Sequence, residues 1–183
     1  MRWKLYEDKI LEHMELQRKL MTACKVFGVE RAVEITLLAM AGEALESVGY
    51  IMDATKPWKQ PKFDIDATRE EVIDIYHFYL QLLILTDTYE EAFGDVSKYG
   101  WFDLKSKDLT AFENACKMTA EVSAELSRWQ DEEQLKLFAS LQWYRMLTMF
   151  QVLEMSPDDV DKLYRSKNAK NFRRIEEKLN GSS

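Results

Sequence analysis

The pattern of apolar and polar positions along the chain is helical almost throughout. Apolar residues recur every three or four positions, and no stretch alternates between apolar and polar residues as a half-buried strand would. The pattern predicts an all-α protein. Its helices are expected at about residues 6–26, 29–54, 68–86, 89–99, 109–129, 131–153 and 156–179.

Turn and capping residues mark several boundaries between these helices. Pro57 and Pro61 forbid a helix between the second and third segments. Asp131 and Gln134 are typical of a capping box, and Ser156 followed by Pro157 is typical of a helix start. Long helices with short connections predict an antiparallel bundle in a single domain, residues 1–183. Residues of about 100–155 are expected to insert extra helices between the third and last core helices, and 180–183 to form a tail.

Composition and charge narrow the class of protein. The chain has 183 residues, 46% hydrophobic and 31% charged, which is a globular balance. A net charge of -7 argues against a nucleic-acid-binding protein. Cys24 and Cys116 are too few for a disulfide framework, so we expect them to be reduced and internal. The start of the chain is charged rather than apolar, and residues 37–52 are too short and too acidic to span a membrane, which predicts a cytoplasmic protein.

Two otherwise apolar helical segments each carry a pair of acids three residues apart. Glu43 and Glu46 are the only charges in residues 37–52, and Asp74 is the only acid in residues 72–85, with Glu71 just before that segment. Residues three apart share a helix face, so each pair directs two carboxylates the same way. Buried carboxylates are costly unless they are compensated. With little nearby positive charge, the four acids predict a site for a hard divalent cation, Mg²⁺ or Mn²⁺.

Three other kinds of site could explain these acids. A solvated face is the usual explanation of such a pair, but the neighbours of Glu43 and Glu46 are mostly apolar. A di-iron bundle needs two Glu-x-x-His motifs. The chain has two histidines, and only His77 has an acid three positions before it. The residue three positions before His13 is Ile10, so His13 is not part of such a motif. The HD-type phosphohydrolases need an adjacent His-Asp pair, which the sequence lacks.

The last helix offers cations for a phosphate substrate. Its residues Tyr164, Lys167, Asn171 and Arg174 fall within an arc of about 80° on one face, at about 100° per residue. Lysine and arginine on that face would neutralise phosphate charge. The alternative is a basic helix end that offsets the helix dipole, and this is our interpretation of Arg165, Lys170 and Arg173. The proline-bracketed loop adds Trp58 and Lys59, which could cover a base and bind phosphate.

These motifs resemble those of a known family. Glu43-x-x-Glu46, Trp58-Lys59 and Glu71-x-x-Asp74 followed by His77-Phe78 resemble the dimeric all-α dUTPases and their phage dCTPase relatives, within the wider MazG-like all-α NTP pyrophosphatases. The ending Leu163-Tyr164-x-x-Lys167-Asn168-x-x-Asn171-x-x-Arg174 resembles the family's phosphate-binding motif. The resemblance covers residues of about 10–175, of which 99–155 match only in being helical.

The resemblance implies an enzyme with assigned residues. It implies a homodimer with two or more Mg²⁺ per site, in which a metal-bound water attacks the α-phosphorus of dUTP or dCTP and releases pyrophosphate and dNMP. The implied metal ligands are Glu43, Glu46, Glu71 and Asp74, with Glu43 and Glu46 as catalytic residues and Glu43 orienting the water. The implied phosphate ligands are Tyr164, Lys167, Asn171, Arg174 and Lys59. The implied base and sugar pocket consists of Gln17, Met21, Trp58, His77 and Phe78.

The sequence departs from the family at the base pocket and at the end of the chain. Met21 stands where the family usually has asparagine, and Arg174 is not followed by the usual Arg-Gln and Gly-Tyr. The substrate is therefore left open between uracil, cytosine and another or modified base, and a non-enzymatic helical binding module is the alternative class. Apolar residues expected at a dimer surface are Trp101, Phe138, Trp143 and Phe150.

Overall fold

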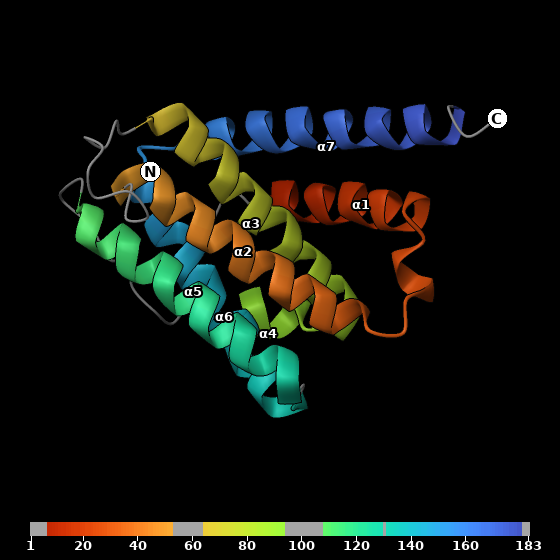
Figure 1. Cartoon of the computed structure of the whole chain (residues 1–183), viewed down its shortest axis with the longest axis horizontal. Helices are drawn as coiled ribbons and strands as arrows, with labels where there is room; N and C mark the ends of the chain where they lie inside the picture. Colours follow the sequence, from red (N-terminus) through yellow and green to blue (C-terminus); the bar gives the residue numbers. More distant parts are fainter. Residues whose placement is uncertain (1–6, 53–63, 94–107, 130, 181–183) are drawn as a thin grey trace.

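The chain is all-helical wherever the structure describes it. The computed structural model describes residues 7–52, 64–93, 108–129 and 131–180 (Figure 1). Their elements are α1 (Glu7–Ala23), the 3-10 helix η2 (Val26–Gly28), α2 (Ala32–Met52), α3 (Ile65–Thr86), α4 (Tyr89–Phe93), α5 (Leu109–Trp129), α6 (Glu132–Val152) and α7 (Pro157–Asn180). The predicted all-α fold is confirmed.

Four long helices form the central bundle. Helix α2 packs on α3 and α5, and α6 packs on the same two helices from the other side. The successive pairs α2–α3 and α5–α6 run antiparallel, and α4 lies against α6 (Figure 1). Helices α1 and α7 lie side by side and both contact α3 (Figure 1). The segments that carry the candidate site residues, from α1, α2 and α7, therefore meet around α3.

Acidic and hydroxyl side chains set the helix starts. The Asp64 carboxylate accepts hydrogen bonds from the backbone N–H groups of Asp66 and Ala67, so α3 begins at Ile65 rather than at residue 68. Asp131 caps α6 through the N–H of Gln134, as predicted. Ser156 and Asp159 bond reciprocally at the start of α7, which makes this a capping box.

The first two helices are shorter than the sequence pattern suggested. Lys25 adopts a left-handed backbone conformation with φ of 57°, which ends the α-helical run after Ala23. The 3-10 turn Val26–Gly28 follows, and α2 begins only at Ala32. Apolar periodicity continued through this corner because Val26, Phe27 and Val29 are apolar, although Phe27 and Val29 are exposed.

Aromatic side chains fill the core between α3 and α6. Tyr76 and Tyr79 of α3 are fully buried, and the Tyr79 hydroxyl donates a hydrogen bond to the carbonyl oxygen of Ala139 at 2.7 Å. The prediction that Phe138, Trp143 and Phe150 lie on a dimer surface is wrong, since all three are buried. Helix α6 is covered by α5 on one side and by α3 and α4 on the other, so it has apolar residues around most of its circumference. Trp101 lies outside the described residues.

The two cysteines occupy different environments. Both are free, and Cys116 is buried in α5 as predicted. The prediction that Cys24 is internal is wrong: it is exposed, because α1 has ended one residue earlier and the chain turns there. None of the described helices is both long and apolar enough to cross a membrane.

Candidate active site

Three of the four predicted acids come together where α2 and α3 pack. Glu43, Glu46 and Glu71 each place a carboxylate oxygen within 4.8 Å of those of the other two. Glu43 and Glu46 lie one turn apart on α2, and Glu71 faces them from α3. Three carboxylate oxygens so close together form a donor set that suits a hard divalent cation.

The environment of these acids is more open than the sequence suggested. Glu43 and Glu71 are half-buried, but Glu46 is exposed, so the expectation that both pairs are buried is wrong for Glu46. The site lies at the edge of the α2–α3 interface, because the apolar residues of α2 face both α3 and α5 and leave the acids at the rim. This position allows solvent and ligands to reach the carboxylates.

The carboxylates repel one another in the absence of a cation. Burial, together with the negative charges of Asp74, Glu71 and Glu46, raises the pKa of Glu43 from 4.5 to about 7. Burial also raises the pKa of Glu71, although a hydrogen bond from Glu43 opposes the change. A hydrogen bond between two carboxyl groups needs a proton on one of them. A divalent cation at the same place would relieve this repulsion, so the residues present fit such an ion.

Asp74 has a different partner from the other three acids. Its Oδ2 atom lies 2.6 Å from Nζ of Lys167 on α7, and Nζ also lies 3.7 Å from Oε2 of Glu70. Burial raises the pKa of Asp74, while Lys167 opposes this shift. The expectation that little positive charge lies near the acids is therefore wrong for Asp74, which the structure joins to a candidate phosphate ligand.

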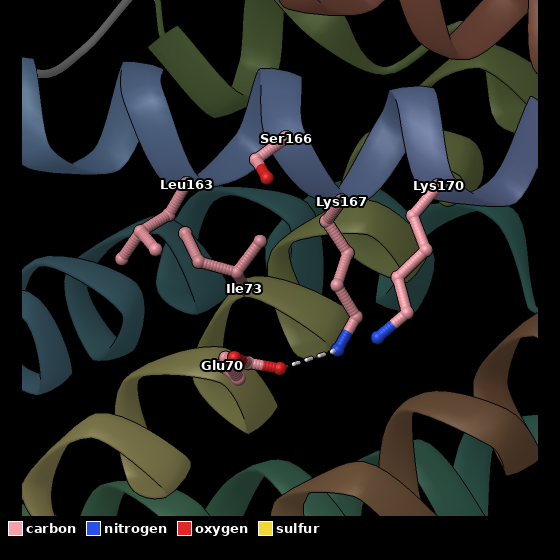
Figure 2. Close-up of a pocket in the computed structure, with 6 residues that line it drawn as sticks. All are labelled: Glu70, Ile73, Leu163, Ser166, Lys167 and Lys170. Atoms are coloured by element: carbon pink, nitrogen blue, oxygen red, sulfur yellow. Dashed lines mark ion pairs between the residues drawn. The ribbon is translucent and has the colours of Figure 1, made fainter.

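A small cavity lies beside this ion pair, between α3 and α7. Its volume is about 80 Å³, and its lining residues are Glu70, Ile73, Leu163, Ser166, Lys167 and Lys170. Figure 2 shows Lys167 and Lys170 extending from α7 toward the side on which Glu70 lies. Lys170, which the sequence pattern had assigned to the helix dipole, therefore accompanies Lys167 at this cavity.

The remaining candidates on α7 continue along the same helix. Asn171 is half-buried and Arg174 is exposed. The charge of Arg174 is close enough to Asp74 to lower the pKa of that carboxyl, which burial raises. The predicted basic face is thus directed toward the acidic rim. Trp58 and Lys59 lie outside the described residues.

Two of the candidate base-pocket residues, Gln17 and His77, form a buried cluster with Tyr164. Nδ1 of His77 lies 2.8 Å from Oε1 of Gln17, and the rings of His77 and Tyr164 stack with centroids 4.3 Å apart. The Tyr164 hydroxyl has one proton, which it shares between the carbonyl oxygen of His13 at 2.9 Å and Oε1 of Gln17 at 3.2 Å. Met21 is fully buried, and Phe78 is partly buried against the core. Tyr164 therefore links α7 to His13 and Gln17 on α1.

One cluster that sequence reasoning missed joins α1 to α7. His13 is fully buried, with Nε2 2.8 Å from Oδ1 of Asp161 and Nδ1 3.3 Å from the Tyr76 hydroxyl. Arg165 donates to the same Asp161 oxygen and also pairs with Glu12. Arg165 therefore anchors α7 to α1 rather than only offsetting the helix dipole. Its spacing of four from Asp161 was the one available signal, but that spacing does not reveal a partner on α1.

Clustered carboxylates that face a lysine- and arginine-bearing helix suit a hydrolase of phosphoanhydride bonds, because they offer ligands for a divalent cation beside positive charges for phosphate. A family model described as dUTPase matches residues 8–179. The chain therefore belongs to the all-α dUTPase family and is a nucleotide pyrophosphohydrolase. This family is generally dependent on divalent metal ions, in agreement with the acidic cluster. Comparisons with curated proteins and with solved structures gave no match.

Proposed function

We propose that the protein hydrolyses a pyrimidine deoxynucleoside triphosphate, dUTP or dCTP or both, to the monophosphate and pyrophosphate in a Mg²⁺-dependent reaction. Water attacks the α-phosphorus, and the bond from this phosphorus to the oxygen that bridges to the β-phosphorus breaks. The observation that carries the proposal is the cluster of Glu43, Glu46 and Glu71 beside the Asp74–Lys167 pair. In this arrangement candidate cation ligands lie next to a candidate phosphate ligand.

The acids would hold the metal ions. Glu43, Glu46 and Glu71 are close enough together to bind one cation, and Asp74 would join them or bind a second. A divalent cation supplies a nucleophilic water at neutral pH and neutralises phosphate charge. Glu43 and Glu46 are the proposed catalytic residues, and Glu43, the more buried of the two, would orient the water by accepting a hydrogen bond from it.

Residues of α7 would hold the phosphates. Lys167, Asn171 and Arg174 are the proposed ligands, and Lys59 would add a further positive charge. Because the Lys167 ammonium has three donors, it can bond a phosphate oxygen as it loosens from Asp74. Tyr164, whose hydroxyl is already engaged by His13 and Gln17, would contribute by fixing the position of α7 and the base pocket.

Gln17, Met21, Trp58, His77 and Phe78 are the proposed base and sugar pocket. Gln17 and His77 are buried and bonded to each other, so both could meet the polar edge of a pyrimidine. Met21 would provide an apolar wall at the position where the family usually has an asparagine side chain. The base preference therefore has to be measured.

A panel of nucleotides tests the reaction and its substrate. The protein is incubated with Mg²⁺ and each of dUTP, dCTP, dTTP, dATP, dGTP and a modified pyrimidine triphosphate, and pyrophosphate release is measured. We expect release from dUTP, dCTP or both, with the monophosphate as the other product. Release from none of them, or inorganic phosphate as the product, would refute the proposal.

Substitution of Glu46 tests the metal assignment. Glu46→Gln removes a charge at an exposed position, so the variant should remain folded. Substituting a residue that hydrogen-bonds to a metal ligand typically lowers metal affinity or activity by about 10- to 100-fold. Substituting the ligand itself should lower activity at least as much. Glu34→Gln is the matched control, because Glu34 lies earlier on the same helix and pairs with Arg31 on the surface. Turnover of Glu46→Gln at the wild-type rate would remove this residue from the site.

Substitution of two neighbouring arginines on α7 tests the phosphate assignment. Arg174→Ala should lower kcat/KM by about tenfold, which corresponds to about 1.4 kcal/mol. Arg173→Ala is the control, because Arg173 is also exposed but points about 100° away around the helix. Equal effects of the two substitutions would mean that the phosphates do not contact Arg174.

We also propose that residues 1–183 form a single domain, that the protein is a homodimer, and that it acts in the cytoplasm. An exposed apolar row on α2, made up of Ile35, Leu38 and Leu45, supports a dimer because it offers a surface of apolar side chains. Free cysteines are typical of the cytoplasm. Light scattering during gel filtration tests the dimer, and a monomeric mass at micromolar concentration would refute it.

A further inference from the structure

A chain of four polar side chains crosses the buried interface between α1, α2 and α3 and ends at His77. It begins at Thr36 on α2 and passes through Gln81 on α3 and Gln17 on α1 before it returns to α3. Thr36, Gln17 and His77 are buried and Gln81 is partly buried. Neither Thr36 nor Gln81 belongs to the motifs by which the sequence resembles the family.

The threonine fixes the direction of every hydrogen bond in this chain. The Thr36 hydroxyl donates its one proton to the carbonyl oxygen of Ala32 at 2.7 Å, so its oxygen accepts from Nε2 of Gln81, also at 2.7 Å. Oε1 of Gln81 is then the end of that amide that faces Gln17 and accepts from its Nε2 at 3.4 Å. Oε1 of Gln17 consequently faces His77.

This direction determines the tautomer of His77. Oε1 of Gln17 accepts a proton, so Nδ1 of His77, 2.8 Å away, is the nitrogen that carries hydrogen. Burial, with the positive charge of Lys167 nearby, lowers the pKa of His77 to about 3, so the ring is neutral. Its Nε2 atom therefore carries a lone pair and acts only as an acceptor.

The acceptor has no partner in the part of the chain that the structure describes. Nε2 of His77 is buried and makes no hydrogen bond there. Buried polar atoms nearly always have a partner, and leaving one unsatisfied is unfavourable. What sets this acceptor apart is its place: it belongs to a candidate base-pocket residue that is bonded to Gln17, so a bound base is a suitable source of the donor.

We propose that Thr36 and Gln81 are positioning residues that hold His77 as a hydrogen-bond acceptor for an N–H group of the nucleotide base. This inference rests on the proposed function. The acceptor suits the N3–H of uracil or the 4-amino group of cytosine. Because Nε2 of His77 only accepts, the site favours bases that present an N–H donor to it. The Gln17 amide has a second N–H, which can donate to a neighbouring acceptor of the base.

The tautomer can be measured without nucleotide. Long-range proton–nitrogen NMR correlations distinguish Nδ1–H from Nε2–H histidines, and the His77→Asn variant identifies the signals of His77. We expect Nδ1–H in the wild-type protein at pH 7. An Nε2–H ring would mean that the chain runs in the opposite direction and would overturn the proposal. Because no turnover is needed, this result is independent of the proposed reaction.

Variants of Thr36 test whether the chain sets specificity. Wild-type protein should bind N3-methyl-dUTP, or N4,N4-dimethyl-dCTP if cytosine is preferred, at least about tenfold more weakly than the parent nucleotide, since a buried acceptor loses its donor. Thr36→Val removes the hydroxyl and should reduce this discrimination and populate the Nε2–H tautomer. Thr36→Ser should restore both. Thr119→Val is the matched control, because Thr119 also bonds the carbonyl four residues earlier and a glutamine across a helix interface.

The outcomes separate this proposal from the proposed function. If Thr36→Val discriminates against the methylated nucleotide as strongly as the wild-type protein and keeps the Nδ1–H tautomer, Thr36 has no positioning role. Equal effects of Thr36→Val and Thr119→Val would assign the effect to general destabilisation and would overturn it too. An Nδ1–H tautomer in a protein that releases no pyrophosphate from any nucleotide would refute the reaction while the orientation of His77 stands.

Discussion

The carboxylate cluster should make the stability of the metal-free protein depend on pH, and Glu43 is the residue through which this can be isolated. In the folded protein the pKa of Glu43 is raised from 4.5 to about 7, chiefly by burial and then by the charge of Asp74. The folded state therefore holds a proton that the unfolded state has lost between pH 4.5 and 7. Stability from this group is present at low pH and is lost as the pH rises through about 7.

The size of the effect follows from the shift. A change from 4.5 to about 7 corresponds to about 3 kcal/mol before solvent screening. Glu43 is half-exposed, so screening should reduce this to about 1–2 kcal/mol. Two buried histidines act in the opposite direction below pH 6.5, because burial lowers the pKa values of His13 and His77. A comparison with a variant at residue 43 cancels their contribution.

The assay is urea unfolding in EDTA of the wild-type protein and of Glu43→Gln, from pH 5 to pH 8. The free energy of unfolding of the variant should rise by about 1–2 kcal/mol relative to the wild type across this range. Adding Mg²⁺ to the wild type should raise its stability more at pH 8 than at pH 5, because protons compete with the cation for the carboxylates. A difference between the two proteins that is independent of pH, or that changes with the opposite sign, would refute the reasoning.

Other predictions concern the fold. Asp64→Ala removes the cap of α3 and should lower the free energy of unfolding by about 1 kcal/mol, measured by urea unfolding against Asp66→Ala as the control. Phe150→Ala should lower it by about 3–5 kcal/mol, because the ring is fully buried, and a loss below 1 kcal/mol would contradict its place in the core. With a thiol reagent, Cys24 should react in the folded protein and Cys116 only after unfolding; equal labelling rates would contradict the structure.

Local sequence patterns predicted the helices and the acid pairs because both depend on residues a few positions apart. The spacing of Glu43 and Glu46 is enough to place them on one face of α2, and the capping residues Asp131 and Ser156 act on the next few N–H groups. Asp64 shows the limit of the same approach: the apolar pattern starts later than the helix, and its cap alone sets the true boundary.

Contacts between distant segments could not be predicted in the same way. His13 and Asp161 are 148 residues apart, and nothing in either local pattern distinguishes a partly buried hydrogen-bonded pair from two surface residues. Apolar residues occur on several sides of the helix that carries Phe138, Trp143 and Phe150, so the pattern alone is compatible with an apolar surface. A helix covered on opposite sides by other helices has this pattern too, and only the packing of α6 against α3, α4 and α5 decides between the two.

The pairing of Asp74 with Lys167 links the two halves of the candidate site. Within the described residues, Asp74 is the one acid of the four that pairs directly with a lysine, while Glu43, Glu46 and Glu71 repel one another. A phosphate that attracts Lys167 would release Asp74 to bind a cation, and a cation near Asp74 would release Lys167 to bind phosphate. Since coupling between two binding sites is reciprocal, each ligand should strengthen the binding of the other. The ion pair thus gives a physical reason why nucleotide and metal would bind together rather than separately.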